Sequence, residues 1–302
     1  MKVLVLYGGD SPEREVSLRS GTAVNEALRT AGIDTLLYDP IQGDDELFRL
    51  VRQVDMVFPI LHGKNCEDGV IQKKLESVGA KFLGSDSKVS EVCFNKHKTH
   101  DLLESAGITM PEFAVVTKND LDNKLFKNPF VLKPVNGGSS LDTLVVRQVR
   151  QDYLDTAVEL LNEYESMMLE ELIEGQEITV PVLADSALPV IAIVPPTDGE
   201  FDYDNKYNGK SQEICPVPVE LVSDLIQKQA QQLALKVHNL LGASHLSRTD
   251  IIVDKDGELF VLELNTMPGM TSQSLFPLSA KVAGNDMDKL VLKLIEIVNR
   301  DS

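Results

Sequence analysis

Three oxygen-bearing side chains lie close together in a predicted β-hairpin near the end of the chain. Two apolar segments flank residues 254–257, whose Asp-Lys-Asp-Gly sequence is typical of a hairpin turn. Glu263 and Asn265 are two residues apart, so a strand directs both toward one face, and Asp250 lies on the neighbouring strand. Hard oxygen donors that converge in this way suit Mg²⁺. The alternative is that the two carboxylates are solvated, although the surrounding Ile, Val and Leu residues argue against a fully exposed face.

A glycine- and serine-rich turn offers a second kind of chemistry. An apolar segment ends at Lys133, and the turn 134–140 (Pro-Val-Asn-Gly-Gly-Ser-Ser) follows it. Its backbone N–H groups and the hydroxyls of Ser139 and Ser140 can bind phosphate, with Lys133 as a cation. The GxxxxGK[ST] motif is absent, and an ordinary hairpin loop is the simpler explanation unless the metal site lies beside the turn.

Two loops of the N-terminal part carry polar residues that could act on a ligand. Glu15 lies between the first predicted strand and the first helix, where a carboxylate can receive a cationic amine. The alternative is that this loop only caps the helix, through Ser11 or Glu13. His62 follows the third predicted strand, and an isolated histidine is more often structural than catalytic. Both loops belong to the expected ligand-binding edge of the sheet, which favours a functional role for His62.

A long polar segment and an arginine complete the set of candidates. Residues 195–218 lack regular periodicity, and a loop of this length is usually a functional lid or disordered. Lys206 and Tyr207 lie within it, although a charged, solvated loop explains both equally simply. Arg248 precedes Asp250 by two residues, where a guanidinium could stabilise an oxyanion or a phosphate. A Ser-His-Asp triad is not supported, because there is no GxSxG motif.

Composition restricts the classes of function. The chain has 302 residues with 29 Lys and Arg against 47 Asp and Glu, a formal net charge of −18, which disfavours a nucleic-acid or anionic-membrane surface. No apolar run approaches the about 20 residues of a transmembrane span, and the apolar run at the N-terminus is too short for a signal peptide. The 3 cysteines are widely spaced and odd in number, as expected of a reduced, cytoplasmic chain without a disulfide framework or zinc cage.

The elements that must position these residues fall into two patterns. Up to about residue 90, apolar strand segments alternate with helical ones, which predicts an α/β fold with a parallel sheet and ligands beyond the carboxyl ends of its strands. After residue 91 the chain becomes rich in β-hairpins and has α+β character. The predicted strands are 3–7, 33–38, 54–60, 128–133, 141–147, 167–169, 177–183, 188–194, 249–253 and 259–264, and the predicted helices are 17–31, 67–78, 89–106, 152–163, 219–241 and 286–299.

The order of these motifs resembles the D-alanine–D-alanine ligase family of the ATP-grasp superfamily, over essentially the whole chain. The stretches that carry the resemblance are 8–17, 62–63 with 67–69, 133–134 with 138–140, 202–203 with 206–207, Arg248 with Asp250, and 263–266 with 268–272. The resemblance implies a Rossmann-like substrate-binding domain at 1–90. A two-lobed ATP-grasp fold would follow, with lobes at 91–175 and 176–302 and the loop 195–218 as a lid.

The resemblance also implies a reaction. ATP would phosphorylate the carboxylate of one D-alanine, and the amine of a second would displace phosphate to give D-alanyl-D-alanine for peptidoglycan. The cofactors implied are ATP and two Mg²⁺, for which Mn²⁺ can substitute, and the assembly implied is a homodimer without nucleic acid or membrane.

Residue roles follow from the same resemblance. On the substrate side, Glu15 would bind the first ammonium with Ser139 and Tyr207, and His62 would lie near that substrate's carboxylate. Arg248 and the Gly269 N–H would stabilise the tetrahedral intermediate, and Ser274 and Leu275 would bind the second carboxylate. The metals would be held by Asp250, Glu263 and Asn265. Lys206 would approach the γ-phosphate, and the rest of the nucleotide would be held by Lys96, Lys133, Ser140, Glu170, Glu171, Ile173 and Glu177.

Some positions depart from the family's usual pattern without removing a residue assigned to chemistry. Asn95 stands where Asp is usual, and Asn136-Gly137 where Arg-Glu is common. Glu171-Leu172 replaces a frequent Lys-Trp pair, and Asp142 replaces a Gly after the two serines.

Three alternatives remain to be weighed against this interpretation. A depsipeptide ligase that uses D-lactate is disfavoured by Tyr207, which favours an amine nucleophile. A nucleotide-binding regulatory protein without catalysis is disfavoured by the intact Arg248, Asp250 and Glu263. A Rossmann dehydrogenase is disfavoured by the absence of GxGxxG and by the β-rich second half.

Overall fold

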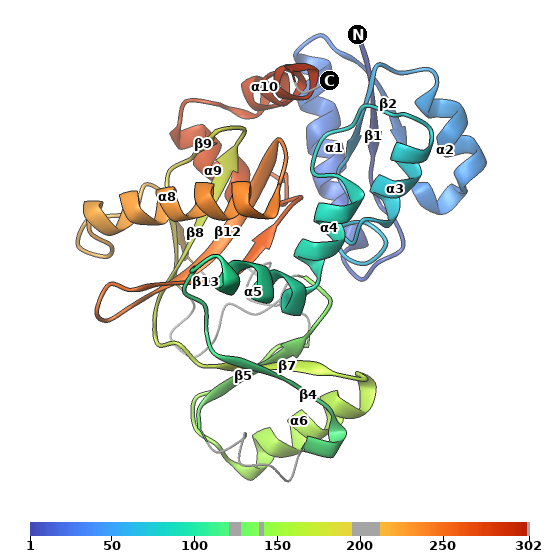
Figure 1. Ribbon diagram of the computed structural model, residues 1–302. Coiled ribbons are helices and arrows are strands. Elements are labelled where there is room, and N and C mark those ends of the chain that lie inside the picture. Colours follow the sequence, from blue (N-terminus) through green and yellow to red (C-terminus); the bar gives the residue numbers. More distant parts are fainter. Residues whose placement is uncertain (121–127, 139–141, 195–211, 301–302) are drawn as a thin grey trace.

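The fold of the chain is given by a computed structural model, which describes residues 1–120, 128–138, 142–194 and 212–300 (Figure 1). Within these ranges the strands form three sheets. The first is parallel, with strand order β2-β1-β3, as the alternation of strand and helix predicts. Its elements are β1 (Lys2–Leu6), α1 (Arg14–Thr30), β2 (Asp34–Tyr38), η1 (Pro40–Gln42), α2 (Asp44–Val51), β3 (Met56–Pro59) and α3 (Val70–Ser77).

Helices cover both faces of this sheet, which is why its central strand is a continuous apolar run. Val3 and Val5 of β1 pack toward α1, whereas Leu4 and Leu6 pack toward α2 and α3. This division follows from the two-residue period of a strand. The carboxyl ends of β1 and β3 therefore point the two N-terminal loops to the same edge.

The last helix of the chain returns to the first domain. α10 (Met287–Arg300) lies beside α1, and Leu294 and Ile297 belong to the same buried cluster as Val24 and Leu28 (Figure 1). The sequence predicts this helix but not its place, because its apolar stripe does not reveal which partner buries it.

The prediction of one continuous helix over residues 89–106 is wrong. Residues 89–106 form two helices, α4 (Ser87–Phe94) and α5 (Lys96–Ser105), and Asn95 between them has extended backbone (φ −95°, ψ 101°). The Asn95 side chain accepts a hydrogen bond from the Lys98 N–H at 2.9 Å and so begins α5. Asparagine favours this capping position over a helix interior, which explains the break.

A second sheet forms a small lobe with its own core. Its strand order is β4-β7-β5-β6, with antiparallel pairing throughout. The elements of the lobe are β4 (Phe113–Val116), η2 (Lys118–Asp120), β5 (Phe130–Pro134), β6 (Leu144–Val146), α6 (Gln151–Glu163) and β7 (Met167–Glu171). Its core residues, among them Phe130, Leu132 and Leu161, form a separate cluster, and Figure 1 shows the lobe set apart from the rest of the chain.

The third sheet is antiparallel and has two unlike faces. Its order is β11-β10-β8-β12-β13, and β9 pairs with β8. α8 packs on the face that carries Ile178, Val180 and Val261. The elements of this part are β8 (Gly175–Leu183), β9 (Ser186–Ala187), β10 (Ile191–Val194), β11 (Gln212–Ile214), α8 (Asp224–Leu241), β12 (Leu246–Asp254), β13 (Leu259–Asn265) and α9 (Leu275–Val282).

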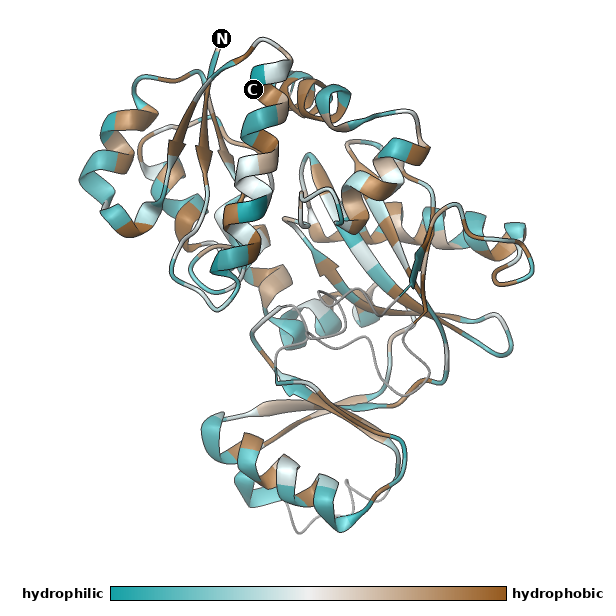
Figure 2. Ribbon diagram, turned by 180° about the vertical axis from the view of Figure 1, so that it is seen from behind, coloured by the Kyte–Doolittle hydropathy of each residue, from teal (hydrophilic) through white to brown (hydrophobic). Residues whose placement is uncertain are grey.

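Hydropathy follows this architecture. In Figure 2 the strands of the parallel sheet are apolar, whereas the helices show polar and apolar residues on different sides. None of the described helices is long and apolar enough to cross a membrane.

Candidate active site

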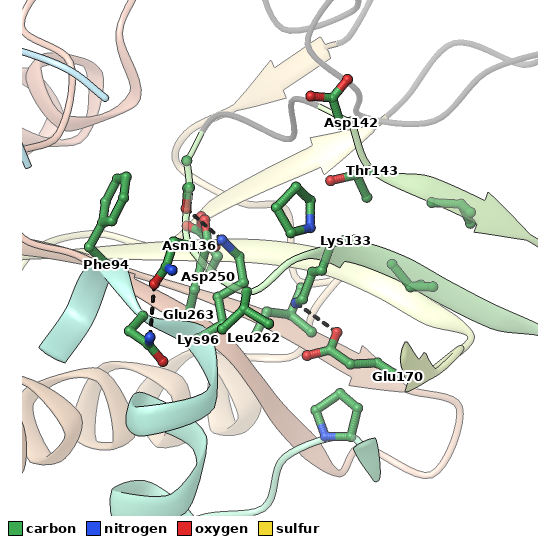
Figure 3. Close-up of a pocket in the computed structure, with 18 of the residues that line it drawn as sticks. Phe94, Lys96, Lys133, Asn136, Asp142, Thr143, Glu170, Asp250, Leu262 and Glu263 are labelled. Carbon is green, nitrogen blue, oxygen red and sulfur yellow. Dashed lines mark hydrogen bonds and ion pairs between the residues drawn. The ribbon is translucent and has the colours of Figure 1, made fainter. Parts of the chain in front are cut away.

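A cavity of about 1260 Å³ lies where the N-terminal loops, the α4–α5 junction and the two antiparallel sheets meet. Its lining includes Lys96 and Lys133 from the first half of the chain and Asp250 and Glu263 from the hairpin (Figure 3). Glu13 from the first loop also lines it. Two of the phosphate-binding candidates, Lys96 and Lys133, and two of the metal-binding candidates, Asp250 and Glu263, thus line one cavity.

A β-bulge gives the hairpin its polar face. Asp250 pairs with Glu263, but the next pair is Ile251 with Val261, so Leu262 is the extra residue. Strict alternation would put Glu263 on the same face as Val261, which is fully buried against α8. Because the bulge shifts the alternation, Glu263 instead lies on the cavity face opposite Asp250.

The carboxylates of the hairpin are neutralised by protein cations. Asp250 is 8% exposed and accepts hydrogen bonds from the Thr179 hydroxyl at 2.5 Å and from both Nε and one terminal nitrogen of Arg248 at 2.8 Å. Lys96 Nζ lies 3.8 Å from Glu263 Oε2. Within the described ranges no group of three or more His, Cys, Asp and Glu residues could hold a metal. Hard oxygen donors for Mg²⁺ are present in the carboxylates of Asp250 and Glu263. Asn265 does not line the cavity and its Oδ1 accepts from the Met267 N–H at 2.8 Å, so substrate phosphate would have to complete the set.

Two lysines bring positive charge to the cavity. Lys133 Nζ lies 2.6 Å from Glu170 Oε2, and these side chains are 10% and 4% exposed (Figure 3). Lys96 Nζ donates to the Gly137 carbonyl at 2.5 Å. Glu177 and Ile173 line the same cavity, as does Glu171, which is exposed.

Of the two carboxylates in the first loop motif, Glu13 lines the cavity, whereas the predicted residue Glu15 does not. Glu15 lies in the first turn of α1, is exposed and does not line the cavity. Glu13 lines it and is 4% exposed. A Cβ on Gly63 would come within 2.6 Å of Glu13 Oε2. Residues two apart at the start of a helix point to nearly opposite sides, so only one of the two can face the cavity.

Only the contacts of its side chain distinguish Glu13 from a residue that merely caps the helix. It occupies the N-cap position of α1, but its side chain makes no capping hydrogen bond. The sequence gives no sign of this, because Glu13 and Glu15 flank the same arginine in one short motif.

An ion pair fixes the loop that carries Glu13. Arg14 contacts Asp39 at 2.6 Å, and the Gly9 N–H donates to the same carboxylate at 3.0 Å. Burial alone would raise the pKa of Asp39, but the hydrogen bonds from Arg14 and from backbone N–H groups outweigh it and lower that pKa. Gly8 (φ +79°) is required here, since a Cβ would lie 2.6 Å from Asp39 Oδ2.

His62 joins the loop after β3 to α1. The ring is 4% exposed, with Nε2 3.3 Å from Ser20 Oγ and Nδ1 3.8 Å from Glu67 Oε1. Ser20 Oγ also accepts from the Met270 N–H at 3.3 Å, so the loop after β13 reaches the same cluster. His62 therefore lies where three chain segments meet.

The loop after β13 leads into the N-terminus of α9. Leu275 begins the helix and Ser274 is its N-cap residue, which makes no capping hydrogen bond and accepts instead from the Thr271 N–H at 3.0 Å. A Cβ on Gly269 would lie 2.8 Å from Ser274 Oγ, so glycine permits the close approach. The first N–H groups of a helix lack intrahelical partners and suit a carboxylate.

Four predicted site residues, Ser139, Ser140, Lys206 and Tyr207, lie outside the described residues. Glu213, which falls within the predicted polar loop 195–218, belongs to a strand and does not line the cavity. Glu213 lies on β11 opposite Ile193, which in turn pairs with Glu177. Burial raises the pKa of Glu213, and the positive charge of Arg248 opposes this rise.

Comparisons with known proteins agree with this geometry. Residues 41–85 match the family model described as D-ala D-ala ligase N-terminus, and residues 102–296 match D-ala D-ala ligase C-terminus. The chain is 38% identical to a D-alanine–D-alanine ligase from Azoarcus sp. (strain BH72), over 97% of this chain and 96% of the relative. The chain belongs to the D-alanine–D-alanine ligase family.

Solved structures of D-alanine ligases have the same fold. The D-alanine–D-alanine ligase from Bacillus anthracis complexed with ATP aligns with a TM-score of 0.81 at 28% identity, covering 99% of this chain and 98% of that one. The VanG D-Ala:D-Ser ligase from Enterococcus faecalis aligns with a TM-score of 0.82 at 30% identity, covering 98% and 99%. The predicted α/β class, with a parallel N-terminal sheet followed by an ATP-grasp fold, is confirmed.

The buried Lys133–Glu170 pair generates a stability prediction. Lys133→Met leaves Glu170 buried without its partner, and we expect the free energy of unfolding to fall by about 3–5 kcal/mol. The double variant Lys133→Met/Glu170→Leu should recover part of this loss, because neither charge is then left alone. Urea denaturation followed by circular dichroism measures both. Lys98→Met is the matched control, since Lys98 and Glu91 are 52% and 62% exposed and such a pair contributes at most about 1 kcal/mol. Equal costs for Lys98→Met and Lys133→Met would contradict the prediction.

Proposed function

We propose that the protein joins two D-alanines into D-alanyl-D-alanine at the expense of ATP, for peptidoglycan synthesis. The observation that carries this proposal is the cavity itself. In a member of the D-alanine–D-alanine ligase family, it brings two lysines, a hairpin with two carboxylates and the N-terminal substrate loops together. The lysines would bind the phosphates of ATP, the carboxylates would bind the metals, and the loops would bind the amino acids.

The nucleotide would lie between the two antiparallel sheets. Lys96 and Lys133 are the cations for its phosphates, and Ser140 and Lys206 are proposed at the γ-phosphate. Glu170, next to Lys133, would accept from the adenine amino group, and Glu177 would accept from the ribose hydroxyls. Glu171 and Ile173 would line the adenine end.

Two Mg²⁺ ions, or Mn²⁺ in their place, would be held by Asp250, Glu263 and Asn265. The contacts that support this are the pairing of Asp250 with Glu263 and of Arg248 with Asn265 on adjacent strands. The metals would neutralise charge on the phosphates during transfer. Arg248 and Lys96 already supply positive charge to these carboxylates.

The two amino acids would occupy the edge of the cavity nearest the parallel sheet. Glu13, in place of Glu15, would bind the ammonium of the first D-alanine together with Ser139 and Tyr207, and His62 would lie near its carboxylate. Ser274 and Leu275 at the N-terminus of α9 would bind the carboxylate of the second.

The chemistry is two displacements. A carboxylate oxygen of the first D-alanine attacks the γ-phosphorus and ADP leaves, which produces an acylphosphate. The amine nitrogen of the second then attacks the acyl carbon, loses a proton, and phosphate leaves as the amide forms. Arg248 and the Gly269 N–H would stabilise the oxyanion of the tetrahedral intermediate. Closure of a lid at 195–218 would protect the acylphosphate from water.

The wider organisation is proposed on the same basis. The domains proposed are 1–90, 91–175 and 176–302. The separate core of the lobe that begins at β4 supports the middle domain, but α4 and α5 pack against α8 and the third sheet, and α10 packs on the first domain. We also propose a homodimer that acts in the cytoplasm, on free amino acids.

The deciding experiment measures phosphate release from ATP with D-alanine, with L-alanine, and with D-alanine plus either D-serine or D-lactate, identifying the products by mass. We expect phosphate release and D-alanyl-D-alanine from D-alanine alone, and none with L-alanine. If a mixed product exceeds D-alanyl-D-alanine when the two candidate second substrates are present at equal concentrations, the second substrate is D-serine or D-lactate instead of D-alanine. No phosphate release with any of them would refute the proposal.

Glu13→Gln removes the negative charge proposed to bind the first ammonium. A hydrogen bond to a charged group contributes about 1.5–3 kcal/mol, so we expect KM for D-alanine to rise by about 10- to 100-fold, with KM for ATP unchanged. Glu15→Gln is the matched control, because Glu15 is exposed on the same helix turn. Steady-state kinetics of both variants decides between them, and a larger effect for Glu15→Gln would reverse the assignment.

Glu263→Ala removes one of the proposed metal ligands. We expect kcat to fall at least about 100-fold, since metal stabilisation of the transferring phosphate contributes several kcal/mol. The Mn²⁺ affinity, read from its electron paramagnetic resonance signal, should fall in parallel. Glu258→Ala, at an exposed position of the same hairpin, should leave both unchanged. Turnover near that of the wild type at saturating Mg²⁺ would remove Glu263 from the metal site.

A further inference from the structure

Two asparagines join the middle lobe to the rest of the chain at the edge of the cavity. Asn95 Nδ2 donates to Asn136 Oδ1 at 2.8 Å, and these two residues also form an isolated antiparallel bridge (Figure 3, dashed line at Asn136). Asn95 lies at the α4–α5 junction, and Asn136 lies in the loop that follows β5. Both line the cavity.

Lys96 strengthens the same junction. Its backbone N–H donates to the Val135 carbonyl at 2.9 Å, and its Nζ donates to the Gly137 carbonyl at 2.5 Å. The residues on either side of Asn136 are therefore both held by the residue that follows Asn95. Hydrogen bonds from Asn95 and Lys96 thus hold three successive residues of the loop 135–138, at the Val135 carbonyl, the Asn136 side chain and the Gly137 carbonyl.

The lobe needs such a polar tether because its apolar core is its own. The cluster that includes Phe130, Leu132 and Leu161 contains only residues of the lobe. Apolar packing therefore holds the lobe together, whereas directional hydrogen bonds set where its loop lies relative to Lys96. A hydrogen bond fixes distance and angle more narrowly than apolar contact does.

We propose that the Asn95–Asn136 amide pair positions the loop 135–138 beside Lys96 at the proposed nucleotide site. Asn95 and Asn136 are positioning residues, which act through the loop 135–138 and through Lys96 on the phosphates of ATP. The inference rests on the proposed function, in which this cavity holds ATP between Lys96 and Lys133.

The oxygen and the NH₂ group of the Asn95 amide make different hydrogen bonds, so a substitution can remove one and keep the other. The effect on folding can therefore be measured apart from the effect on positioning. Its oxygen accepts from the Lys98 N–H and begins α5, while its NH₂ group reaches Asn136. Serine at position 95 keeps an oxygen for the cap but has no NH₂ group. Alanine at position 136 removes the acceptor and leaves the cap intact, at a residue whose side chain is exposed.

The test compares Asn95→Ser, Asn136→Ala and the double variant with the wild type. ATP binding is measured by isothermal titration calorimetry with the non-hydrolysable analogue AMP-PNP and Mg²⁺. We expect each single variant to raise Kd for the nucleotide by about 3- to 10-fold, the size of one net hydrogen bond. The double variant should rise no further, because both substitutions remove the same contact.

Kinetics and hydrogen exchange separate positioning from loss of folded protein. A positioning role predicts a raised KM for ATP with KM for D-alanine and the thermal midpoint unchanged, and faster amide exchange at residues 135–138. A merely structural role would lower the active fraction and the thermal midpoint without changing Kd. Asn239→Ala is the control, since Asn239 is exposed on α8 and does not line the cavity.

Two results would overturn the inference. One is a Kd for Asn136→Ala within twofold of the wild type, and the other is a double variant whose effect equals the product of the two single effects. Failure of the proposed function is a distinct outcome, because it would appear as absence of AMP-PNP binding by the wild-type chain itself.

Discussion

The site depends on a sheet that must be apolar on one face and charged on the other. α8 requires Ile178, Val180 and Val261 on its side of the sheet, whereas the cavity receives Asp250 and Glu263 from the other. A regular hairpin cannot do both, because Val261 and Glu263 are two residues apart and would share a face. The extra residue Leu262 resolves this conflict, and the polar face follows from a local irregularity in the ladder.

Enclosing these carboxylates, of which Asp250 is buried and Glu263 partly exposed, imposes a second requirement, which is compensation of their charge. A carboxylate removed from water without a partner costs several kcal/mol. Asp250 meets this requirement through Arg248 and Thr179, and Glu263 lies near Lys96. A chain with a net charge of −18 therefore gathers cations at one cavity. The cavity lining still holds more carboxylates than cations, so it is Lys96 and Lys133 that would make this acidic protein compatible with an anionic nucleotide.

Sequence reasoning predicted those parts of the fold that follow from periodicity. The parallel sheet, the hairpin of β12 and β13 and the helices α6, α8 and α10 follow from apolar spacing alone. It failed where a single residue changed the backbone path. Asn95 broke a helix whose apolar pattern continues across it. The bulge at Leu262 was not predicted either, although the predicted strand and the shared face of Glu263 and Asn265 are present. A pattern of apolar residues does not reveal the hydrogen bond that begins α5 or the register shift in β13.

The choice between Glu13 and Glu15 illustrates the same limit at the level of a site. Motif order brings the segment 8–17 to the correct edge of the sheet, but the motif contains two carboxylates separated by one arginine. Which of them faces the cavity depends on the residue at which α1 begins. Because Asp39 holds both the Gly9 N–H and the Arg14 side chain, the loop ends where Glu13 is still turned inward. Which carboxylate faces the cavity is thus set by an ion pair outside the cavity, and it could be inferred only once that contact was known.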